Sequence, residues 1–317
     1  MSSNTMKLSL FLCLSMCLGI GILRFSYTAL LPGTREAFGW STDFAGLLGS
    51  ANLLGYLIGA YTAMRLPQDR SMSRYIQISA FAGMFSLMCC AFSGFSEVWY
   101  IVWRVISGIS GGLMMILSPS VVAQCCELQD RLKINFIGFS GIGLGVLIAT
   151  LFLPYLDQIS IQTAWLILCG FALLICLCLS GLIQKFKPYL SVQAPSTTSK
   201  ISLNSVFYSL LAVYACSAFA YIPHSLFWID YLSQQLELSL FWINFNWILY
   251  GFGSALGAFS AYALARKFGN FAALKILYSL YIVAIFIATL EGQALLTLSS
   301  SFLTGMLNPA VVFLTSY

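Results

Sequence analysis

Ten long apolar runs follow one another along this chain, and they constrain its fold more strongly than any other feature. A run of 18 or more apolar residues, wound as an α-helix, is long enough to cross the hydrocarbon core of a bilayer. The runs lie at Leu8–Leu31, Ala45–Met64, Tyr75–Gly94, Val98–Cys126, Ile134–Leu153, Ala164–Ile183, Val206–Ile229, Phe241–Leu264, Ala273–Leu290 and Leu295–Tyr317. The charged content of 8% excludes a soluble globular domain, in which about 25% of residues are charged. The sequence therefore predicts an all-α polytopic membrane protein.

The basic residues fall on alternate sides of these predicted spans. Twelve of the fifteen lie in one set of connections, and they are Lys7, Arg65, Arg70, Arg74, Arg131, Lys133, Lys185, Lys187, Lys200, Arg266, Lys267 and Lys275. The opposite set holds one basic residue, Arg35, together with most of the acidic residues. Because Lys and Arg collect in cytoplasmic loops, we expect the N-terminus to lie in the cytoplasm.

One long polar connection divides the predicted helices into six and four. It covers residues 185–204 and combines lysines, prolines and a Ser/Thr cluster, which is typical of a solvated linker. We therefore predict an N-terminal six-helix bundle at residues 1–184, a cytoplasmic linker at 185–204, and four helices of a second bundle at 205–317.

The second and eighth predicted helices share a glycine pattern. The segment GYLIGAYTA, which starts at Gly55, aligns with GSALGAFSA, which starts at Gly253. Small residues four apart let two helix backbones approach closely in lipid, and transporters are built from internal repeats. We predict helix-packing contacts at Gly55, Gly59, Gly253 and Gly257 and, in the fifth predicted helix, at Gly141 and Gly145. The alternative to a true repeat is generic helix packing.

Arg24 carries the clearest functional signal. It lies seven residues inside the outer end of the first predicted helix, a depth of about 10 Å at 1.5 Å per residue. A charge at this depth is costly and usually faces a bundle interior or a wet cavity. We expect Arg24 to bind an anionic ligand. The alternative is that its side chain extends outward to the membrane interface or pairs with a helix end.

Arg104 lies at a similar depth in the fourth predicted helix. No carboxylate lies comparably deep in the first half of the chain, so the two arginines lack an evident internal partner. Two cations at one level indicate a site for a carboxylate or phosphate, which guanidinium groups bind through bidentate hydrogen bonds. The alternative for Arg104 is that it hydrogen-bonds only to neighbouring backbone carbonyls.

A second polar cluster lies at the end of the seventh predicted helix, where Pro223, His224 and Asp230 follow one another. Proline bends or breaks a helix, and histidine titrates near neutral pH. His224 and Asp230 are therefore candidates for a gate or a coupling site. The alternative for His224 is a place in the aromatic belt at the membrane interface.

Other chemistries lack their sequence patterns. The chain has no GxxxxGK[ST] phosphate loop, no HExxH and no GxSxG motif, and it has one histidine. We therefore predict no enzyme activity, no catalytic residue, no cofactor and no metal site. The ten cysteines lie in or beside apolar runs without a CxxC spacing and are interpreted as small apolar residues. No basic patch indicates nucleic-acid binding.

Several segments together resemble one family of transporters. They are GIGILRFSYTALLP at residues 19–32, the pair Ala45-Gly46, and NLLGYLIGA at residues 52–60. These resemble the YbfB/YjiJ-like branch of the major facilitator superfamily. The segment RVISG at residues 104–108 is similar to that superfamily's fourth-helix Arg-xxx-Gly motif, and the glycine-rich fifth helix is similar to its antiporter-type motif.

The resemblance implies two six-helix bundles around a central cavity lined by the first, fourth, seventh and tenth helices. The substrate-binding residues that it implies are Arg24, Arg104, Tyr27, Tyr221 and Asn308. The loop after the second helix loosely matches the Gly-xxx-Asp-Arg-x-Gly-Arg signature, which makes Asp69 and Arg70 candidates for gating. Because the superfamily has twelve helices, the resemblance also implies that the last two are missing from this chain.

The expected function is a secondary active transporter of the bacterial inner membrane, acting as a monomer by alternating access. Its substrate is expected to be a small solute, such as an organic anion or another metabolite. Transport is expected to be driven by an ion gradient, with protons as one candidate, or to occur as uniport. The alternative is a ten-helix membrane protein that transports nothing, either a sensor or assembly partner or a nonfunctional fragment.

Overall fold

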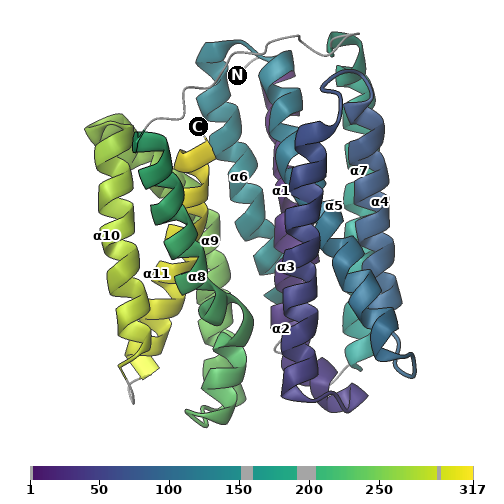
Figure 1. Ribbon diagram of the computed structural model, residues 1–317, viewed down its shortest axis with the longest axis vertical. Coiled ribbons are helices and arrows are strands. Elements are labelled where there is room, and N and C mark those ends of the chain that lie inside the picture. Colours follow the sequence, from purple (N-terminus) through teal and green to yellow (C-terminus); the bar gives the residue numbers. More distant parts are fainter. Residues whose placement is uncertain (1–2, 151–159, 191–204, 291–293, 317) are drawn as a thin grey trace.

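The computed structural model describes residues 3–150, 160–190, 205–290 and 294–316. Throughout these residues the chain forms long helices that run up and down side by side, and no strand occurs among them (Figure 1). The predicted all-α polytopic fold is confirmed. The helical elements are α1 (Ser3–Met16), η1 (Cys17–Ile22), α2 (Leu23–Phe38), α3 (Thr42–Arg65), α4 (Met72–Cys90), α5 (Glu97–Cys125), α6 (Leu128–Thr150), α7 (Ile161–Phe186), η3 (Lys187–Tyr189), α8 (Ser205–Gln234), α9 (Leu240–Phe268), α10 (Asn270–Ala288) and α11 (Ala294–Ser316).

Nine helical spans of the described chain are long and apolar enough to cross a membrane, and one of them is the continuous run Ser3–Phe38 formed by α1, η1 and α2. The third predicted span, α4, is not among the nine. Arg74 and Gln77 in its first turns make it more polar than its neighbours. It nevertheless packs along α5 and α7, so neighbouring helices cover part of its surface.

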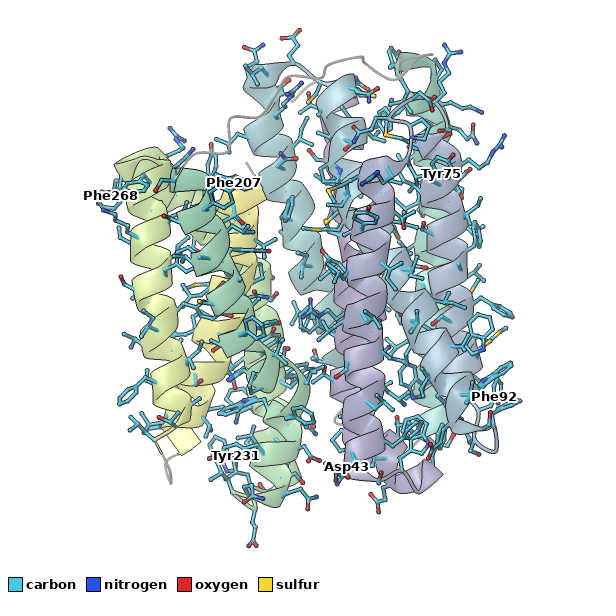
Figure 2. The ribbon with its side chains drawn as sticks, in the orientation of Figure 1. Asp43, Tyr75, Phe92, Phe207, Tyr231 and Phe268 are labelled. Atoms are coloured by element: carbon cyan, nitrogen blue, oxygen red, sulfur yellow. The ribbon has the colours of Figure 1, made fainter. Side chains whose placement is uncertain are left out.

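Apolar side chains also cover the outside of the bundle. Phe92 and Phe268 are both about half exposed there, at 45% and 49% (Figure 2). A soluble protein rarely exposes a continuous apolar surface of this kind, whereas the tails of membrane lipids solvate it well. The exposed surface therefore agrees with the integral membrane location that the composition predicts.

Most basic residues of the described chain, apart from Arg24, Arg35 and Arg104, gather at one end of the bundle. Arg65 ends α3, and Arg266 and Lys267 lie in the last turn of α9. The helices alternate in direction, so these ends lie on the same side as the N-terminus, at the top of Figure 1. Tyr75, Phe207 and Phe268 mark this end in Figure 2. Three charges used in the sequence argument, on Asp157, Lys200 and Glu291, lie outside the described residues, as do residues 191–204 of the predicted linker.

Glycines bring α3 and α5 into close contact. A Cβ atom at Gly55 would overlap the carbonyl oxygen of Val105, and one at Gly59 would overlap that of Ile109. Backbone here lies against backbone, which larger residues would prevent.

The same geometry recurs between α9 and α11. A Cβ atom at Gly253 would overlap the carbonyl oxygen of Phe302, and one at Gly257 would lie 2.5 Å from that of Met306. These glycines stand 198 positions after their counterparts in α3 (253 − 55 and 257 − 59), and both carbonyls stand 197 positions after theirs in α5 (302 − 105 and 306 − 109). The two helix pairs therefore repeat one packing arrangement, as the internal repeat predicts.

α6 packs on both the first helices and the second group of helices. Gly141 lies against the backbone of Cys13 in α1, and a Cβ atom at Gly145 would lie 2.6 Å from the Cα of Gly21 in η1. On its other side, Gly143 of α6 lies against the backbone of Ala255 in α9. α6 thus joins the helices that precede residues 191–204 to those that follow them.

A second junction between the two groups of helices lies toward the end of the bundle that is opposite to the cluster of basic residues. The Thr28 hydroxyl in α2 donates to the carbonyl oxygen of Ser225 in α8 at 2.8 Å. Nearer this end, Arg35 of α2 forms an ion pair with Asp230 of α8 at 3.1 Å. We call this set of contacts between α2 and α8 the outer junction, because the predicted topology places it on the side away from the cytoplasm. It holds α8 against the first group at one end only.

The other half of α8 stands away from its neighbours. Nearly every described side chain from Phe207 to Ala220 is exposed, whereas those of Tyr221 and Trp228 are buried. α8 therefore changes its surroundings near its middle, between an exposed half and a half that packs at the outer junction.

Candidate functional site

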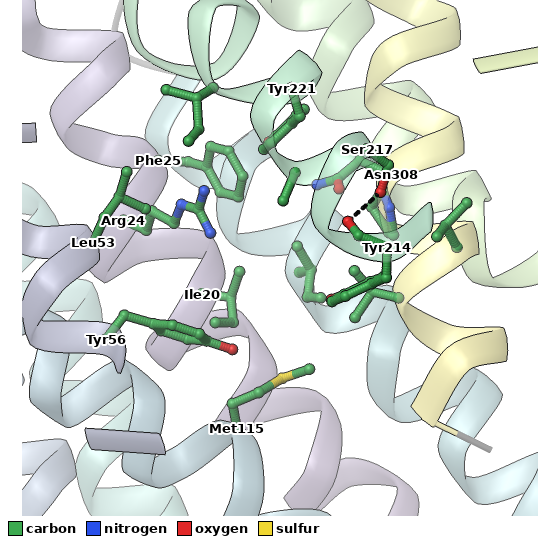
Figure 3. Close-up of a pocket in the computed structure, with 16 residues that line it drawn as sticks. Ile20, Arg24, Phe25, Leu53, Tyr56, Met115, Tyr214, Ser217, Tyr221 and Asn308 are labelled. Carbon is green, nitrogen blue, oxygen red and sulfur yellow. Dashed lines mark hydrogen bonds between the residues drawn. The ribbon is translucent and has the colours of Figure 1, made fainter. Parts of the chain in front are cut away.

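A cavity of about 250 Å³ lies between the two groups of helices (Figure 3). η1, α2, α3, α5 and α6 contribute its wall on one side, and α8 and α11 on the other. The residues that matter most for its chemistry are Ile20, Arg24, Phe25, Leu53, Tyr56, Met115, Tyr214, Ser217, Tyr221 and Asn308. Three of the predicted substrate-binding residues, Arg24, Tyr221 and Asn308, thus share this cavity.

A short π-helix, η1, precedes Arg24 and was not predicted from the sequence. It contains Gly19, which lies against α5, and Gly21, where a Cβ atom would lie 2.6 Å from the Cα of Gly145 in α6. A π segment has a wider turn than an α-helix, so it changes the direction of the residues that follow, and such segments often occur at functional sites. The GIGI sequence of residues 19–22 was the only available signal for this feature.

Arg24 extends into the cavity rather than toward a membrane interface (Figure 3). Its guanidinium carbon lies 5.4 Å from the ring centre of Phe25 and 5.8 Å from that of Tyr221, close enough for cation–π attraction. Within the part of the chain that the structure describes, no ion pair or hydrogen bond engages this guanidinium group. The side chain therefore retains its donors for a ligand.

Arg104 has a different environment. It is 2% exposed, and its guanidinium carbon lies 4.2 Å from the ring centre of Tyr27. Its nitrogens donate to the carbonyl oxygens of Leu23 at 3.4 Å and Leu48 at 3.5 Å. Arg104 is thus hydrogen-bonded to backbone carbonyls, which the sequence analysis gave as the alternative to ligand binding. The structure does not place Arg104 on the wall of the cavity, so the expected pair of ligand-binding cations becomes one cation there.

Tyr27 also lies away from the cavity. Its hydroxyl donates to the carbonyl oxygen of Ala45 at 2.7 Å, and its buried ring faces Arg104. In its place the structure brings Tyr56 and Tyr214 to the cavity wall, which the sequence argument did not select. A spacing of three to four residues along α8 at Tyr214, Ser217 and Tyr221 is a helical-face signal that could have identified one of them.

Tyr221 links the cavity to the packed interior of the second group. Its hydroxyl hydrogen-bonds to that of Tyr250 in α9. The Tyr250 ring stacks on Trp247, with ring centres 4.7 Å apart, and both rings are buried. This support fixes the position of the Tyr221 ring beside Arg24.

His224 lies one turn after Tyr221 on α8 and lines a second cavity of about 450 Å³ with Trp228 and Tyr231. Its ring is 5% exposed and stacks on Trp228, with ring centres 4.2 Å apart. Its Nε2 atom has no hydrogen-bond partner among the described residues. Pro223 does not break the helix, because α8 continues to Gln234.

Trp228 belongs to a buried polar network of three helices. Its indole nitrogen donates to the Ser301 hydroxyl of α11 at 2.8 Å, which in turn donates to the Asn246 side chain of α9 at 2.7 Å. Networks of this kind hold helices together where lipid provides no water. The ring beside His224 is therefore firmly positioned.

None of the remaining predicted gating residues lines the cavity between the two groups of helices. Asp69 precedes α4, and its carboxylate accepts a hydrogen bond from the backbone nitrogen of Ser71 at 2.7 Å. Hydrogen bonds from Ser71 hold the pKa of Asp69 below its usual range. Arg70 is exposed beside it. Asp230 forms the ion pair of the outer junction instead of contacting His224.

Membrane-spanning helices that enclose a charged cavity, with opposite walls supplied by two groups of helices, are the architecture of a polytopic membrane transporter. The family comparison agrees, because the model described as "Uncharacterised MFS-type transporter YbfB" matches residues 16–316. The chain therefore belongs to this family of the major facilitator superfamily. Its resemblance to the YbfB-like branch is confirmed.

Known proteins show the same relationship. The chain is 22% identical over 258 residues to the uncharacterised MFS-type transporter YceJ of Bacillus subtilis, and the match covers 80% of this chain but only 65% of YceJ. The solved human organic anion transporter MFSD10 has a TM-score of 0.70 at 18% identity, covering 98% of this chain and 85% of that one. The proton:xylose symporter XylE bound to 6-bromo-6-deoxy-D-glucose has a TM-score of 0.73 at 16% identity, covering 99% and 82%. These similarities concern the fold.

Proposed function

We propose that this protein is a secondary transporter that carries a small organic anion across a bacterial inner membrane, with Arg24 binding the charge of the substrate. The observation that carries this proposal is the unpaired guanidinium group in a cavity between two groups of helices. A charge within a membrane protein is costly, and one that faces a cavity is most simply explained by a ligand that neutralises it.

Alternating access is the proposed mechanism, with residues 1–184 and 205–317 as the two moving units. In the structure the units meet at the outer junction, where Arg35 binds Asp230, while the first half of α8 stands away from its neighbours. With the N-terminus in the cytoplasm, this arrangement corresponds to a carrier closed toward the outside. Transport would require the outer junction to open and α8 to close against the first unit.

His224 is the proposed site of coupling if protons drive transport. The cavity that it lines has no charged residue on its described wall, and Tyr231 is the other titratable residue there. Beyond that wall lies Tyr250 of α9, a further titratable group, with its ring centre 6.3 Å from that of His224. A proton bound at His224 would place a charge on α8 one turn from Tyr221. If His224 couples transport to protons, a pH gradient should accelerate entry in the unmodified protein but not in His224→Gln. A pH gradient without effect on the unmodified protein would leave uniport as the mechanism.

The test uses purified protein reconstituted in liposomes at neutral pH and a panel of probes whose anions are ionised at that pH, because ionised solutes cross lipid slowly without a carrier. The panel contains benzenesulfonate, benzene-1,3-disulfonate and gluconate, with benzenesulfonamide as an uncharged probe. We expect the protein to accelerate entry of at least one anion, and Arg24→Met to abolish that entry. Arg65→Met makes the same chemical change at an exposed end of α3 and should leave entry unchanged. Entry equal to that of protein-free liposomes for every anion would overturn the proposal.

A further inference from the structure

The chemistry of the cavity wall restricts the class of anion further, and this inference rests on the proposed function. We infer that the substrate is a compact monoanion with an apolar body, such as an aromatic or branched carboxylate or sulfonate. Three independent features of the cavity carry the inference: its charge, the composition of its wall, and its size.

The charge of the cavity favours one negative charge on the ligand. Arg24 is the only ionisable residue with a formal charge on the described wall, and no carboxylate accompanies it. Arg104 is held by Tyr27 and by two backbone carbonyls, so it is not available to a second anionic group. A dianion would therefore bring one uncompensated charge into a site of low polarity, which costs several kcal/mol or forces the group to take up a proton.

The wall of the cavity favours an apolar body. Aliphatic, Phe, Met and Pro side chains form most of it, among them Ile20, Phe25 and Met115. Polar side chains are the minority, six of the sixteen, and two of them already have partners. Tyr221 bonds to Tyr250, and the Ser217 hydroxyl donates to the carbonyl oxygen of Tyr214 at 2.8 Å, the dashed line in Figure 3.

A hydroxylated body would meet this wall unfavourably. Each sugar-like hydroxyl that leaves water needs a new hydrogen bond, and an unsatisfied one costs about 1–3 kcal/mol. Phe25, Tyr56 and Tyr221 instead present ring surfaces near Arg24 (Figure 3). Rings contact other rings and apolar groups favourably. A ligand would thus place its charged end at Arg24 and its apolar body against these side chains.

The size of the cavity favours a small ligand. Its volume of about 250 Å³ lies below the range of roughly 300–1,000 Å³ that encloses drug-sized molecules. A single ring or a short branched chain with one acidic group fits such a space, whereas a fused-ring or nucleotide-sized anion does not.

The closing experiment measures competition by the same set of probes. Entry of a radiolabelled probe that the protein transports is followed while unlabelled benzenesulfonate, benzene-1,3-disulfonate, gluconate or benzenesulfonamide is added in excess. We expect benzenesulfonate to inhibit at concentrations at least tenfold lower than the other three. Compared with benzenesulfonate, benzene-1,3-disulfonate carries a second negative charge, and gluconate replaces the apolar ring by a hydroxylated chain. Benzenesulfonamide keeps the apolar ring and has no charge.

A variant separates this inference from the proposed function. Met115→Gln adds an amide to the wall without changing Arg24, and we expect it to weaken inhibition by benzenesulfonate several-fold while gluconate changes little. Equal or stronger inhibition by gluconate or the disulfonate in the unmodified protein would overturn the inference, although Arg24-dependent anion transport would stand. Entry that Arg24→Met leaves unchanged would overturn the proposed function itself.

Discussion

Arg24 and Arg104 show that the same residue type serves two different purposes at similar depth in the bundle. Arg104 is enclosed by Tyr27 and backbone carbonyls, so its stem and head group fill space between α2, α3 and α5. Arg24 is only partly buried and faces the cavity. A buried long side chain stabilises through the packing of its stem as well as through its charge. Arg104 therefore supports the fold, and Arg24 is available for binding.

Replacing each arginine by alanine should separate these roles. Arg104→Ala leaves a cavity and removes the contacts with Tyr27, and large-to-small changes in packed interiors cost about 2–5 kcal/mol. The Arg24 side chain already faces a cavity, so Arg24→Ala creates no new void in a packed interior. Such substitutions change the free energy of unfolding by about 0.5 kcal/mol or less. We expect heated, detergent-solubilised Arg104→Ala to lose its monodisperse peak several degrees earlier than the unmodified protein, and Arg24→Ala to follow the unmodified curve. Equal shifts for the two variants would contradict this assignment.

At the scale of helices, glycine determines how closely neighbours approach. The α3–α5 and α9–α11 pairs place glycines against carbonyl oxygens at corresponding positions, so each pair depends on the absence of a Cβ atom. Lipid tails are as apolar as leucine, and close packing of backbones replaces the hydrophobic effect as the force between such helices. Not every helical glycine serves this purpose, because Gly181 of α7 has no atom near the position of a Cβ.

A pair of glycine substitutions tests this distinction. Gly257→Ala would place its methyl group 2.5 Å from the carbonyl oxygen of Met306. Overpacking of this kind typically costs about 1–3 kcal/mol. Gly181→Ala meets no neighbour and gains up to about 1 kcal/mol of helix propensity. Thermal unfolding monitored by tryptophan fluorescence should therefore shift downward for Gly257→Ala and stay equal or rise for Gly181→Ala. A downward shift for both would show that glycine content, rather than close contact, governs stability.

The spans and the packing glycines could be predicted because both follow from the position of residues along a helix. Apolar length indicates where a helix crosses the membrane, and a four-residue glycine spacing indicates a close face. The rotation of a helix about its own axis decides which residues face the cavity, and it could not be predicted in this way. The sequence placed Arg104 and Tyr27 on cavity helices, but a hydropathy pattern does not give the rotation of α5 or α2 that turns both side chains away from the cavity. For Tyr27 this rotation also follows η1, whose π turn is not encoded in such a pattern. For the same reason Tyr56 of α3 could not be identified as a cavity residue.

At the scale of the whole molecule, the two groups of helices meet most specifically at the outer junction. It combines the Arg35–Asp230 ion pair with the hydrogen bond from Thr28 to Ser225. Beside it, the rings and branches of Phe227 and Leu226 contact Gly46 and Gly49 of α3. In the proposed alternating-access mechanism, such contacts would exist only in one arrangement of the two groups, so their strength would set the population of that arrangement.

Weakening the ion pair should shift this balance modestly. Asp230 and Arg35 are 16% and 19% exposed, and an ion pair near the surface contributes about 1 kcal/mol or less, or roughly a fivefold change in population at most. We expect Asp230→Asn to increase amide hydrogen exchange at the outer ends of α2 and α8 while α4 is unaffected. The exchanged pair Arg35→Asp with Asp230→Arg should restore protection. Protection that is unchanged in Asp230→Asn would show that the remaining contacts are sufficient to hold the junction.

The single positive charge in the cavity also has an electrical consequence. In the proposed mechanism, an empty carrier would present Arg24 to one side of the membrane and then to the other, whereas a carrier loaded with a monoanion would present a neutral site. A membrane potential acts on displaced charge at about 2.3 kcal/mol per elementary charge per 100 mV. In uniport of a monoanion, the voltage would therefore act on the return of the empty carrier and not on the step that carries the substrate.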